Sequence, residues 1–177
     1  MSSSQQPFPW PNCSSVASLV LTPDGEFRVE GNARSISNAE DRKIFLDLRR
    51  QADLIFTSYK TIEAEEYLAT ADSRVRVVSR AKGEPGASQI DFEKFLILVS
   101  GDETRKFFEF GPKLLAAAIL AGVNFRLQLN VTQAQFQQED ISRLLLKLGL
   151  GGENSIQRNY LGKHLTGFEV NYGGSAH

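Results

Sequence analysis

The chain has 177 residues, 41% of them hydrophobic, which is the usual size for one domain with a substantial core. Lys and Arg total 20 against 21 for Asp and Glu, and no basic run is interleaved with aromatic residues, which argues against nucleic-acid binding. A single cysteine excludes an intrachain disulfide. This cysteine and the two histidines, which are far apart in the sequence, do not have the spacing of metal ligands. The start lacks the pattern of a signal peptide, and no apolar run approaches the roughly 20 residues that span a bilayer, so we expect a soluble, cytoplasmic protein without membrane contact.

The N-terminal segment, residues 1–14, is rich in Ser, Gln and Pro, which predicts a flexible arm before a single domain over residues 15–177. The β-branched, apolar run over residues 15–22 predicts a strand. The turn signal Pro23-Asp24-Gly25 then leads to an expected second, short strand over residues 26–30.

The next part of the chain alternates between helical and strand patterns. Ser37 to Glu40 has the Ser-x-x-Glu form of a capping box, and the apolar residues behind it recur at helical spacing. This predicts a helix from about residue 38 to residue 52. The pattern further predicts a strand over residues 54–58, a short helix over 62–69, a strand over 74–79 and a loop over 82–87.

The C-terminal half begins with an apolar run within residues 92–100, and the aromatic run FFEF over 107–110 predicts a strand. A buried helix is expected over residues 113–121, with Gly122 as its C-terminal cap. The alternation in FRLQLNV, residues 125–131, predicts a strand with one wet face at an antiparallel edge of the sheet. A short helix or turn over 141–148 and a closing strand over 165–172 complete the chain.

This alternation of strands and helices predicts an α/β fold with helices on both faces of the sheet and antiparallel strands near the C-terminal end. Ligands of such folds bind outside the carboxyl ends of the strands, beside helix N-termini. Two segments have that placement: Phe110 to Lys113, and Thr57 to Thr61. The first is also a common turn with Pro at the first helical position, and the second is equally a polar loop, so each remains open by itself.

Several catalytic motifs are absent from the sequence. There is no Walker loop, no Gly-x-Gly-x-x-Gly motif and no Gly-x-Ser-x-Gly elbow, so nucleotide hydrolysis and Ser-His-Asp hydrolysis are poorly supported. Asp24 lies in a typical hairpin turn, and Arg49 lies near a helix end, where a cation is favourable to the dipole in any case.

Taken in chain order, however, the segments LVLTPDG, SISNAEDRKIFLDLRRQADLIFTSYKTIEAEEY, VRVVSR, EFGPKLLAAAILAGV and FRLQLNV resemble the RibD C-terminal family. This family is the reductase domain of the riboflavin-biosynthesis deaminase/reductase. The resemblance spans nearly the whole chain from residue 15 to residue 172. It implies a dihydrofolate reductase-like fold, with a mixed, mostly parallel sheet, helices on both faces and antiparallel C-terminal strands. It also implies a homodimeric, NADPH-dependent oxidoreductase similar to the 5-amino-6-(5-phosphoribosylamino)uracil reductase of riboflavin biosynthesis. Such an enzyme transfers hydride to a small, phosphorylated heterocyclic substrate: a pyrimidine, a pteridine or a related compound, with the riboflavin intermediate itself as one option.

The resemblance also implies roles for individual residues. The family's cofactor-binding motifs match positions at the ends of three predicted strands: Ser58, Thr61, Ser79, Arg80, Gly111 and Pro112. Its substrate-binding motifs match a second set, which includes an arginine that reaches a phosphate: Asp24, Ser37, Arg49, Glu65 and Glu66. Glu109 matches the acid ahead of the glycine turn and is the candidate catalytic residue, which orients a ribose hydroxyl or joins a proton path.

The chain departs from the family pattern at four places. Ser18 stands where members have a lysine, Ser35 where they have an aromatic residue, and Tyr67 to Ala69 run on without the usual proline and arginine. Phe110 replaces the first glycine of the turn, where it adds bulk close to the expected pyrophosphate. An alternative hypothesis is therefore a non-catalytic member that serves as a binding or assembly module. A third is a flavin- or pterin-binding protein.

Overall fold

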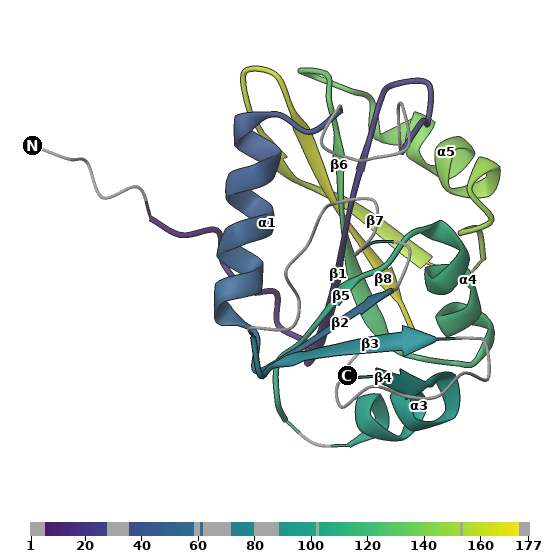
Figure 1. The fold of residues 1–177 in the computed structure, drawn as a ribbon. Coiled ribbons are helices and arrows are strands. Elements are labelled where there is room, and N and C mark those ends of the chain that lie inside the picture. Colours follow the sequence, from purple (N-terminus) through teal and green to yellow (C-terminus); the bar gives the residue numbers. More distant parts are fainter. Residues whose placement is uncertain are drawn as a thin grey trace, which may run out of the picture.

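The computed structural model describes residues 6–27, 36–58, 61, 72–79, 89–101, 103–152 and 154–173. Within these residues one eight-stranded sheet has the strand order β4-β3-β2-β5-β1-β6-β8-β7 (Figure 1). The elements follow the chain as β1 (Ser15–Leu21), α1 (Ala39–Gln51), β2 (Leu54–Ser58), β3 (Val75–Ser79), β4 (Gln89–Asp91), α3 (Phe92–Ser100), β5 (Lys106–Glu109), α4 (Pro112–Leu120), β6 (Phe125–Val131), η3 (Gln138–Asp140), α5 (Ile141–Lys147), β7 (Asn154–Leu161) and β8 (Thr166–Tyr172).

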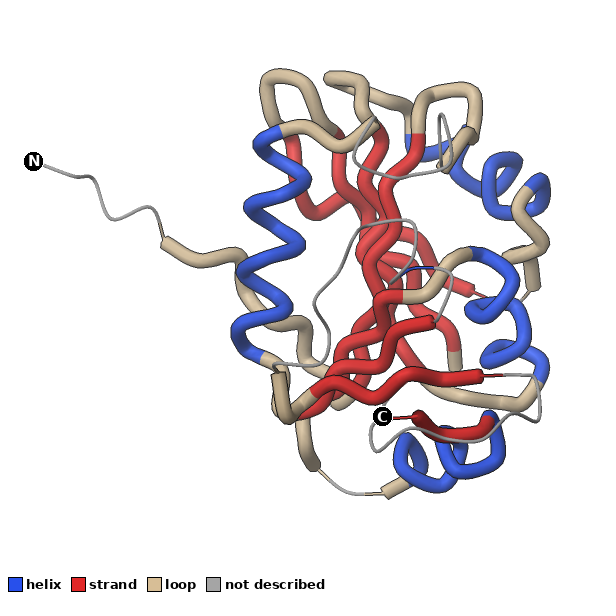
Figure 2. Tube along the Cα trace, viewed as in Figure 1, coloured by secondary structure: helices blue, strands red, loops and turns tan. Residues whose placement is uncertain are grey.

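The strand pairing confirms the predicted mixed sheet. The neighbours from β4 to β6 pair in parallel, whereas β6 with β8 and β8 with β7 are antiparallel. The helices lie on both faces: α1 covers one, and α3, α4 and α5 cover the other (Figure 2). A parallel sheet needs this double cover because both of its faces are apolar.

Two apolar cores follow from the alternation of side chains along the central strands. On the α1 face, Ile44 and Leu48 pack against Phe107 and its neighbours. On the other face, Phe108 packs with Phe95 of α3 and with the apolar residues of α4 and α5. Adjacent residues of β5 thus belong to different cores, which fixes Glu109 on the same face as Phe107, toward α1.

The start of α1 differs by one residue from the predicted capping box. Asn38, not Ser37, is the N-cap, and its side-chain oxygen accepts a hydrogen bond of 2.9 Å from the Asp41 amide. Glu40 does not reach back to the cap, because its carboxylate accepts from the Tyr160 hydroxyl and from the His164 amide instead. The N-cap is therefore Asn38, and hydrogen bonds of Glu40 connect the start of α1 to the loop before β8.

The end of α4 confirms Gly122 as the terminating residue. Gly122 has a φ of +76°, and its amide donates to the Ile119 carbonyl, while the Val123 amide donates to the Ala118 carbonyl. This pair of bonds is the Schellman arrangement, in which glycine takes the left-handed conformation without steric cost.

Three other expectations are corrected. Residues 26 and 27 are not a strand, because Glu26 hydrogen-bonds back to Thr22 and closes a turn; the rest of that expected strand lies outside the described residues. Strand β6 is not at an edge and has no wet face: Gln128 and Asn130 are 1% and 0% exposed. The strand at the antiparallel edge is β7, which the sequence pattern did not reveal because its residues are mostly polar and exposed.

The apolar run over residues 92–100 forms α3, and the strand and helix predictions over 54–58, 74–79, 107–110, 113–121, 141–148 and 165–172 are confirmed within one or two residues. The helix expected over 62–69 and the loop expected over 82–87 lie outside the described residues.

The described part of the N-terminal arm, residues 6–14, contains no helix or strand and packs beside α1. The Phe8 amide donates to the Asp47 carboxylate, and Gln51 donates to the Phe8 carbonyl. The Phe8 ring meets Tyr160 edge to face, so the arm covers the rim of the α1-side core.

Candidate functional site

The candidate cofactor residues lie where three neighbouring parallel strands end. Strands β3, β2 and β5 are adjacent in the sheet and point the same way, so Ser79, Ser58 and the turn after Glu109 share one edge. At the end of β2 the Ser58 hydroxyl lies 2.8 Å from the Thr61 hydroxyl and accepts a 3.1 Å hydrogen bond from the Thr61 amide. The topology therefore brings these positions together, as ligand-binding edges of α/β sheets require.

The turn between β5 and α4 has open space on its outer side. Gly111 is the N-cap of α4 without a side-chain cap bond, and Pro112 is the first helical residue. Among the described residues, a Cβ built on Gly111 meets no heavy atom within 4 Å. Within this part of the chain, the positive end of the helix dipole is not crowded.

The Phe110 side chain does not occupy the space at the outer side of this turn. Its ring is 2% exposed and lies on the face opposite α1, stacked on Phe108 with ring centroids 5.5 Å apart and edge to face with Phe95 at 5.3 Å. The bulk that distinguishes it from glycine is accommodated by the core under α3 and α4. The crowding expected from this substitution is therefore not found at the outer side of the turn.

Glu109 ends β5 as a buried carboxylate on the α1 face, with 5% of its surface exposed. Arg49, in the last turn of α1, donates from Nε to Oε1 of Glu109 at 2.7 Å. Burial raises the pKa of Glu109 to about 7, although the Arg49 charge and hydrogen bond oppose this shift. Glu109 can therefore exchange a proton close to neutral pH.

A second ion pair adjoins the first. Asp72 accepts from Arg49 Nη1 at 3.4 Å and from Arg74 Nη2 at 2.8 Å, and the Arg74 hydrogen bonds lower the pKa of Asp72 to about 2. The sequence pattern did not indicate a role for either residue: Asp72 lies just before the predicted strand over residues 74–79, and Arg74 is the first residue of that strand. Only the fold shows that they meet Arg49.

Thr57 stands beside Glu109 on the neighbouring strand, since the two residues are in register between β2 and β5. Its hydroxyl is fully buried and has no hydrogen-bond partner within the described part of the chain. The two side chains project to the same face, so a polar group without a partner adjoins the Glu109 carboxylate.

A row of hydrogen-bonded polar side chains crosses the α1 face of the sheet further toward its C-terminal strands. Gln128 exchanges hydrogen bonds with Asn159 and donates to Asn130 at 2.9 Å, and Asn130 donates to Asp41 at 2.7 Å. Ser37, one of the candidate substrate residues, donates to the other Asp41 oxygen at 2.6 Å. Burial raises the pKa of Asp41, and the bonds from Ser37 and Asn130 oppose that shift.

The sequence contained a signal for part of this row. Asp41, Ile44 and Leu48 share one face of α1, so an acid on that apolar stripe implies a buried carboxylate with a partner. Gln128 and Asn130 alternate with leucines in β6, which is equally the pattern of a solvated face. The sequence could not distinguish these two cases.

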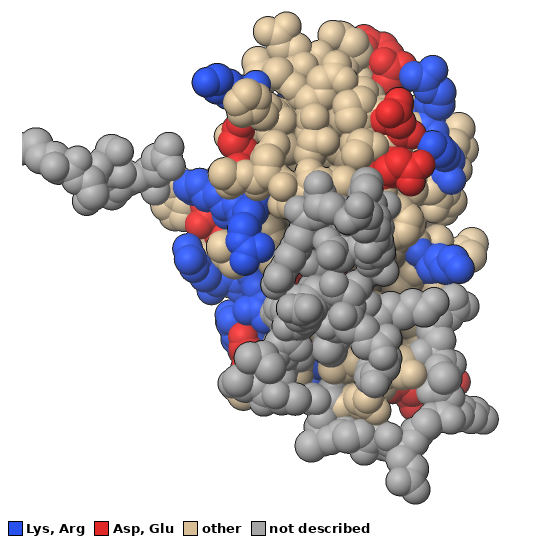
Figure 3. All heavy atoms as spheres, turned by 45° about the horizontal axis from the view of Figure 1, so that its top comes forward, with Lys and Arg blue, Asp and Glu red and all other residues tan. Residues whose placement is uncertain are grey.

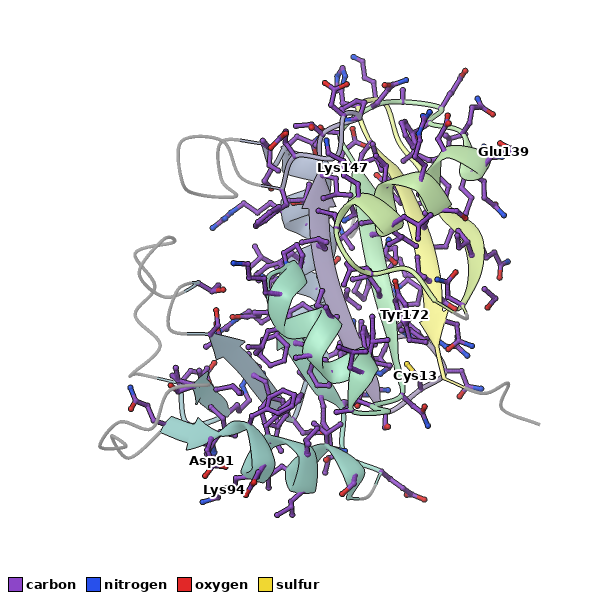
Figure 4. The ribbon with its side chains drawn as sticks, turned by 90° about the vertical axis from the view of Figure 1, so that its right-hand side faces the viewer. Cys13, Asp91, Lys94, Glu139, Lys147 and Tyr172 are labelled. Atoms are coloured by element: carbon purple, nitrogen blue, oxygen red, sulfur yellow. The ribbon has the colours of Figure 1, made fainter. Side chains whose placement is uncertain are left out.

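Asp24 lies in the turn that follows β1 and contacts α5. Its carbonyl accepts a 2.7 Å hydrogen bond from Lys147 of α5, which covers the face opposite α1 (Figure 4). Arg80, Glu65 and Glu66, the remaining candidates, lie outside the described residues.

In Figure 3, Lys and Arg side chains gather on the α1 side, at the left of the view, with single Asp or Glu side chains among them. At the upper right, Asp and Glu side chains lie beside further Lys and Arg side chains. In the described residues, no helix combines the length and apolar composition needed to cross a membrane, and no group of His, Cys, Asp and Glu is arranged to hold a metal ion.

No protein-family model and no curated protein matches this sequence. Many solved structures are similar in fold, among them the following two. A pyrimidine reductase-like protein from Corynebacterium diphtheriae superposes with a TM-score of 0.63 and 12% identity, covering 89% of this chain and 91% of its own. Dihydrofolate reductase from Enterococcus faecalis, complexed with NADP(H) and RAB-propyl, gives a TM-score of 0.57 and 12% identity, covering 89% and 95%.

Together with the strand order, these two structures show that the chain has a dihydrofolate reductase-like fold, as expected from the resemblance. At 12% identity the similarity establishes the fold alone. Function must be argued from the residues at the site.

Proposed function

We propose that the protein is an NADPH-dependent reductase of the RibD C-terminal type, which transfers hydride to a small, phosphorylated heterocyclic substrate. The observation that carries this proposal is the meeting of two features at one edge of the sheet. Candidate cofactor positions end β3, β2 and β5, and a buried acid with a pKa of about 7 ends the same β5. Both structures similar in fold are named as reductases or reductase-like, one of them complexed with NADP(H).

The residues at this edge fit a dinucleotide. Gly111 and Pro112 would hold the pyrophosphate at the α4 N-terminus, where a Cβ on Gly111 meets no atom of the described residues within 4 Å. The hydroxyls of Ser58 and Thr61, 2.8 Å apart, would bind phosphate or ribose oxygens, and Ser79 would adjoin the adenosine end. When bound, the nicotinamide supplies the hydride.

Glu109 would hold a proton beside the reacting group. Its carboxyl group is buried and paired with Arg49 at 2.7 Å, and its pKa of about 7 allows proton delivery near neutral pH. Ser37 and Arg49 would bind the substrate on the same α1 side. The roles of Asp24, Glu65, Glu66 and Arg80, the homodimer and the cytoplasmic location remain predictions from the resemblance.

Titration of the purified protein with NADPH, followed by nucleotide fluorescence or calorimetry, tests the proposal. We expect saturable binding that weakens when Ser58 and Thr61 are both replaced by alanine. Ser100→Ala is the matched control, because its hydroxyl bonds only within α3 to the Ile97 carbonyl among the described contacts. Absence of binding at millimolar NADPH would exclude the proposal.

The rival is a non-catalytic binding or assembly module. One observation favours it: Arg49 and Glu109, the candidates for phosphate binding and proton delivery, are already paired with each other. A binding module predicts no oxidation of NADPH with any pyrimidine or pteridine substrate, even where the nucleotide binds. Assays that follow the loss of NADPH absorbance in the presence of a panel of such compounds separate the two functions.

A further inference from the structure

Arg49 lies between two carboxylates from different parts of the fold. Its Nε donates to Glu109 at 2.7 Å and its Nη1 contacts Asp72 at 3.4 Å. The arginine side chain is 17% exposed, whereas that of Glu109 is 3% exposed. A long side chain with several rotatable bonds is therefore held in one direction at the border of the buried site.

Arg74 fixes the second carboxylate. Its Nε and Nη2 donate to the two oxygens of Asp72 at 3.0 and 2.8 Å, a bidentate pair. Its Nη1 also donates to the carbonyls of Arg49 and Ala52, at 3.2 and 3.0 Å, at the end of α1. Arg74 thus engages Arg49 twice: directly at the main chain, and through Asp72 at the guanidinium.

We propose that Asp72 and Arg74 are positioning residues, which hold the Arg49 guanidinium against Glu109 without contacting the substrate. The functional consequence rests on the proposed role of Glu109. An arginine side chain loses rotamer freedom when it is fixed in one geometry, and the Arg74–Asp72 pair supplies a preformed partner that offsets this loss. Neither residue belongs to the candidate site read from the sequence.

The charges around Glu109 make the direction of its pKa shift a test of the proposal. Within the described residues they are Arg49 from α1, and Asp72 and Arg74 from the segment entering β3; Thr57 on β2 contributes a neutral hydroxyl. If Asp72 acts only as a nearby negative charge, its removal lowers the pKa of Glu109. If Asp72 positions Arg49, its removal releases the arginine and raises the pKa of Glu109.

The experiment is a pH titration of the Glu109 carboxyl carbon by NMR in nucleotide-free, ¹³C-labelled protein, with Glu109→Gln to assign the resonance. We expect Asp72→Asn to shift the midpoint upward by about one pH unit. Arg74→Lys keeps the charge but loses the bidentate geometry, so it is expected to shift the midpoint in the same direction. Asp72→Glu should restore most of the wild-type value.

Asp53→Asn is the matched control. It also removes one negative charge close to Arg74, but the Asp53 side chain accepts from the Arg105 amide and makes no hydrogen bond to Arg49 among the described contacts. We expect no upward shift for this variant. A downward shift or no shift in Asp72→Asn, with Arg74→Lys unchanged in a folded protein, overturns the proposal. Because no nucleotide is present, failure of NADPH binding leaves this result intact.

Discussion

Asn130 of β6 donates a 2.7 Å hydrogen bond to the Asp41 carboxylate of α1, across 89 residues of sequence. Both side chains are buried, and each also bonds to another polar side chain: Asn130 to Gln128, and Asp41 to Ser37. A buried polar row of this kind stabilises the fold only while every member has its partner. It fixes the N-terminal half of α1 on the sheet.

Replacement of Asn130 by alanine is expected to lower the free energy of unfolding by about 2 kcal/mol, because Asp41 and Gln128 each lose a buried hydrogen bond. Denaturant titration measures the change. Asn154→Ala is the control, since its side chain makes an exposed bond to the Gly152 carbonyl, and we expect a change within about 0.5 kcal/mol. Equal stabilities of the two variants would contradict the importance of the row.

Gly167→Ala is expected to destabilise the protein by about 1 to 3 kcal/mol. Gly167 lies opposite Asn130 in the β6–β8 pair, and a Cβ there would approach Gln128 Nε2 and Tyr160 Cβ to 2.8 Å. Gly101→Ala is the matched control, because that glycine has a φ of −82° and a Cβ would have its nearest contacts at 3.9 Å. Thermal unfolding of both variants should show a lower midpoint only for Gly167→Ala.

Phe110→Ala tests whether this residue obstructs the proposed cofactor turn. Since its ring packs on Phe108 and Phe95 in the core, we expect a loss of about 3 to 4 kcal/mol in stability and little change in NADPH affinity. Leu120→Ala, at a side chain 89% exposed, should leave stability unchanged. An NADPH affinity that appears only in Phe110→Ala would show that the wild-type ring blocks the site.

The raised pKa of Glu109 predicts a pH dependence of stability. The folded protein binds the Glu109 proton more tightly than the unfolded chain does, because the pKa of Glu109 is about 7 in the fold and has its ordinary value of 4.5 in the unfolded chain. The contribution is therefore fully present below pH 4.5 and is lost as the pH rises through 7. Relative to Glu109→Gln, the wild type should lose on the order of 3 kcal/mol between pH 4.5 and pH 8. Parallel stability curves for the two proteins would contradict this assignment.

Much of the fold could be predicted from local pattern. The β-branched run of β1, the Pro-initiated α4 and its Gly122 terminus each carry the signal for their structure in a few neighbouring residues. The mostly polar β7 could not be found this way, because an edge strand is specified by its pairing with β8 and not by an apolar face. For the same reason, the local pattern of β6 did not distinguish its buried polar residues from solvated ones.

The sequence by itself determined the mixed α/β architecture and placed Glu109 and the Gly111-Pro112 turn at the end of one strand, because hydrophobic periodicity and turn chemistry act over short stretches. Only the tertiary structure shows which side chains contact each other. In the fold, Phe110 packs in the core and Asp41 accepts a hydrogen bond from Asn130. Arg49 forms ion pairs with Glu109 and Asp72. These contacts depend on helix placement and strand order, which bring together residues that no local pattern connects.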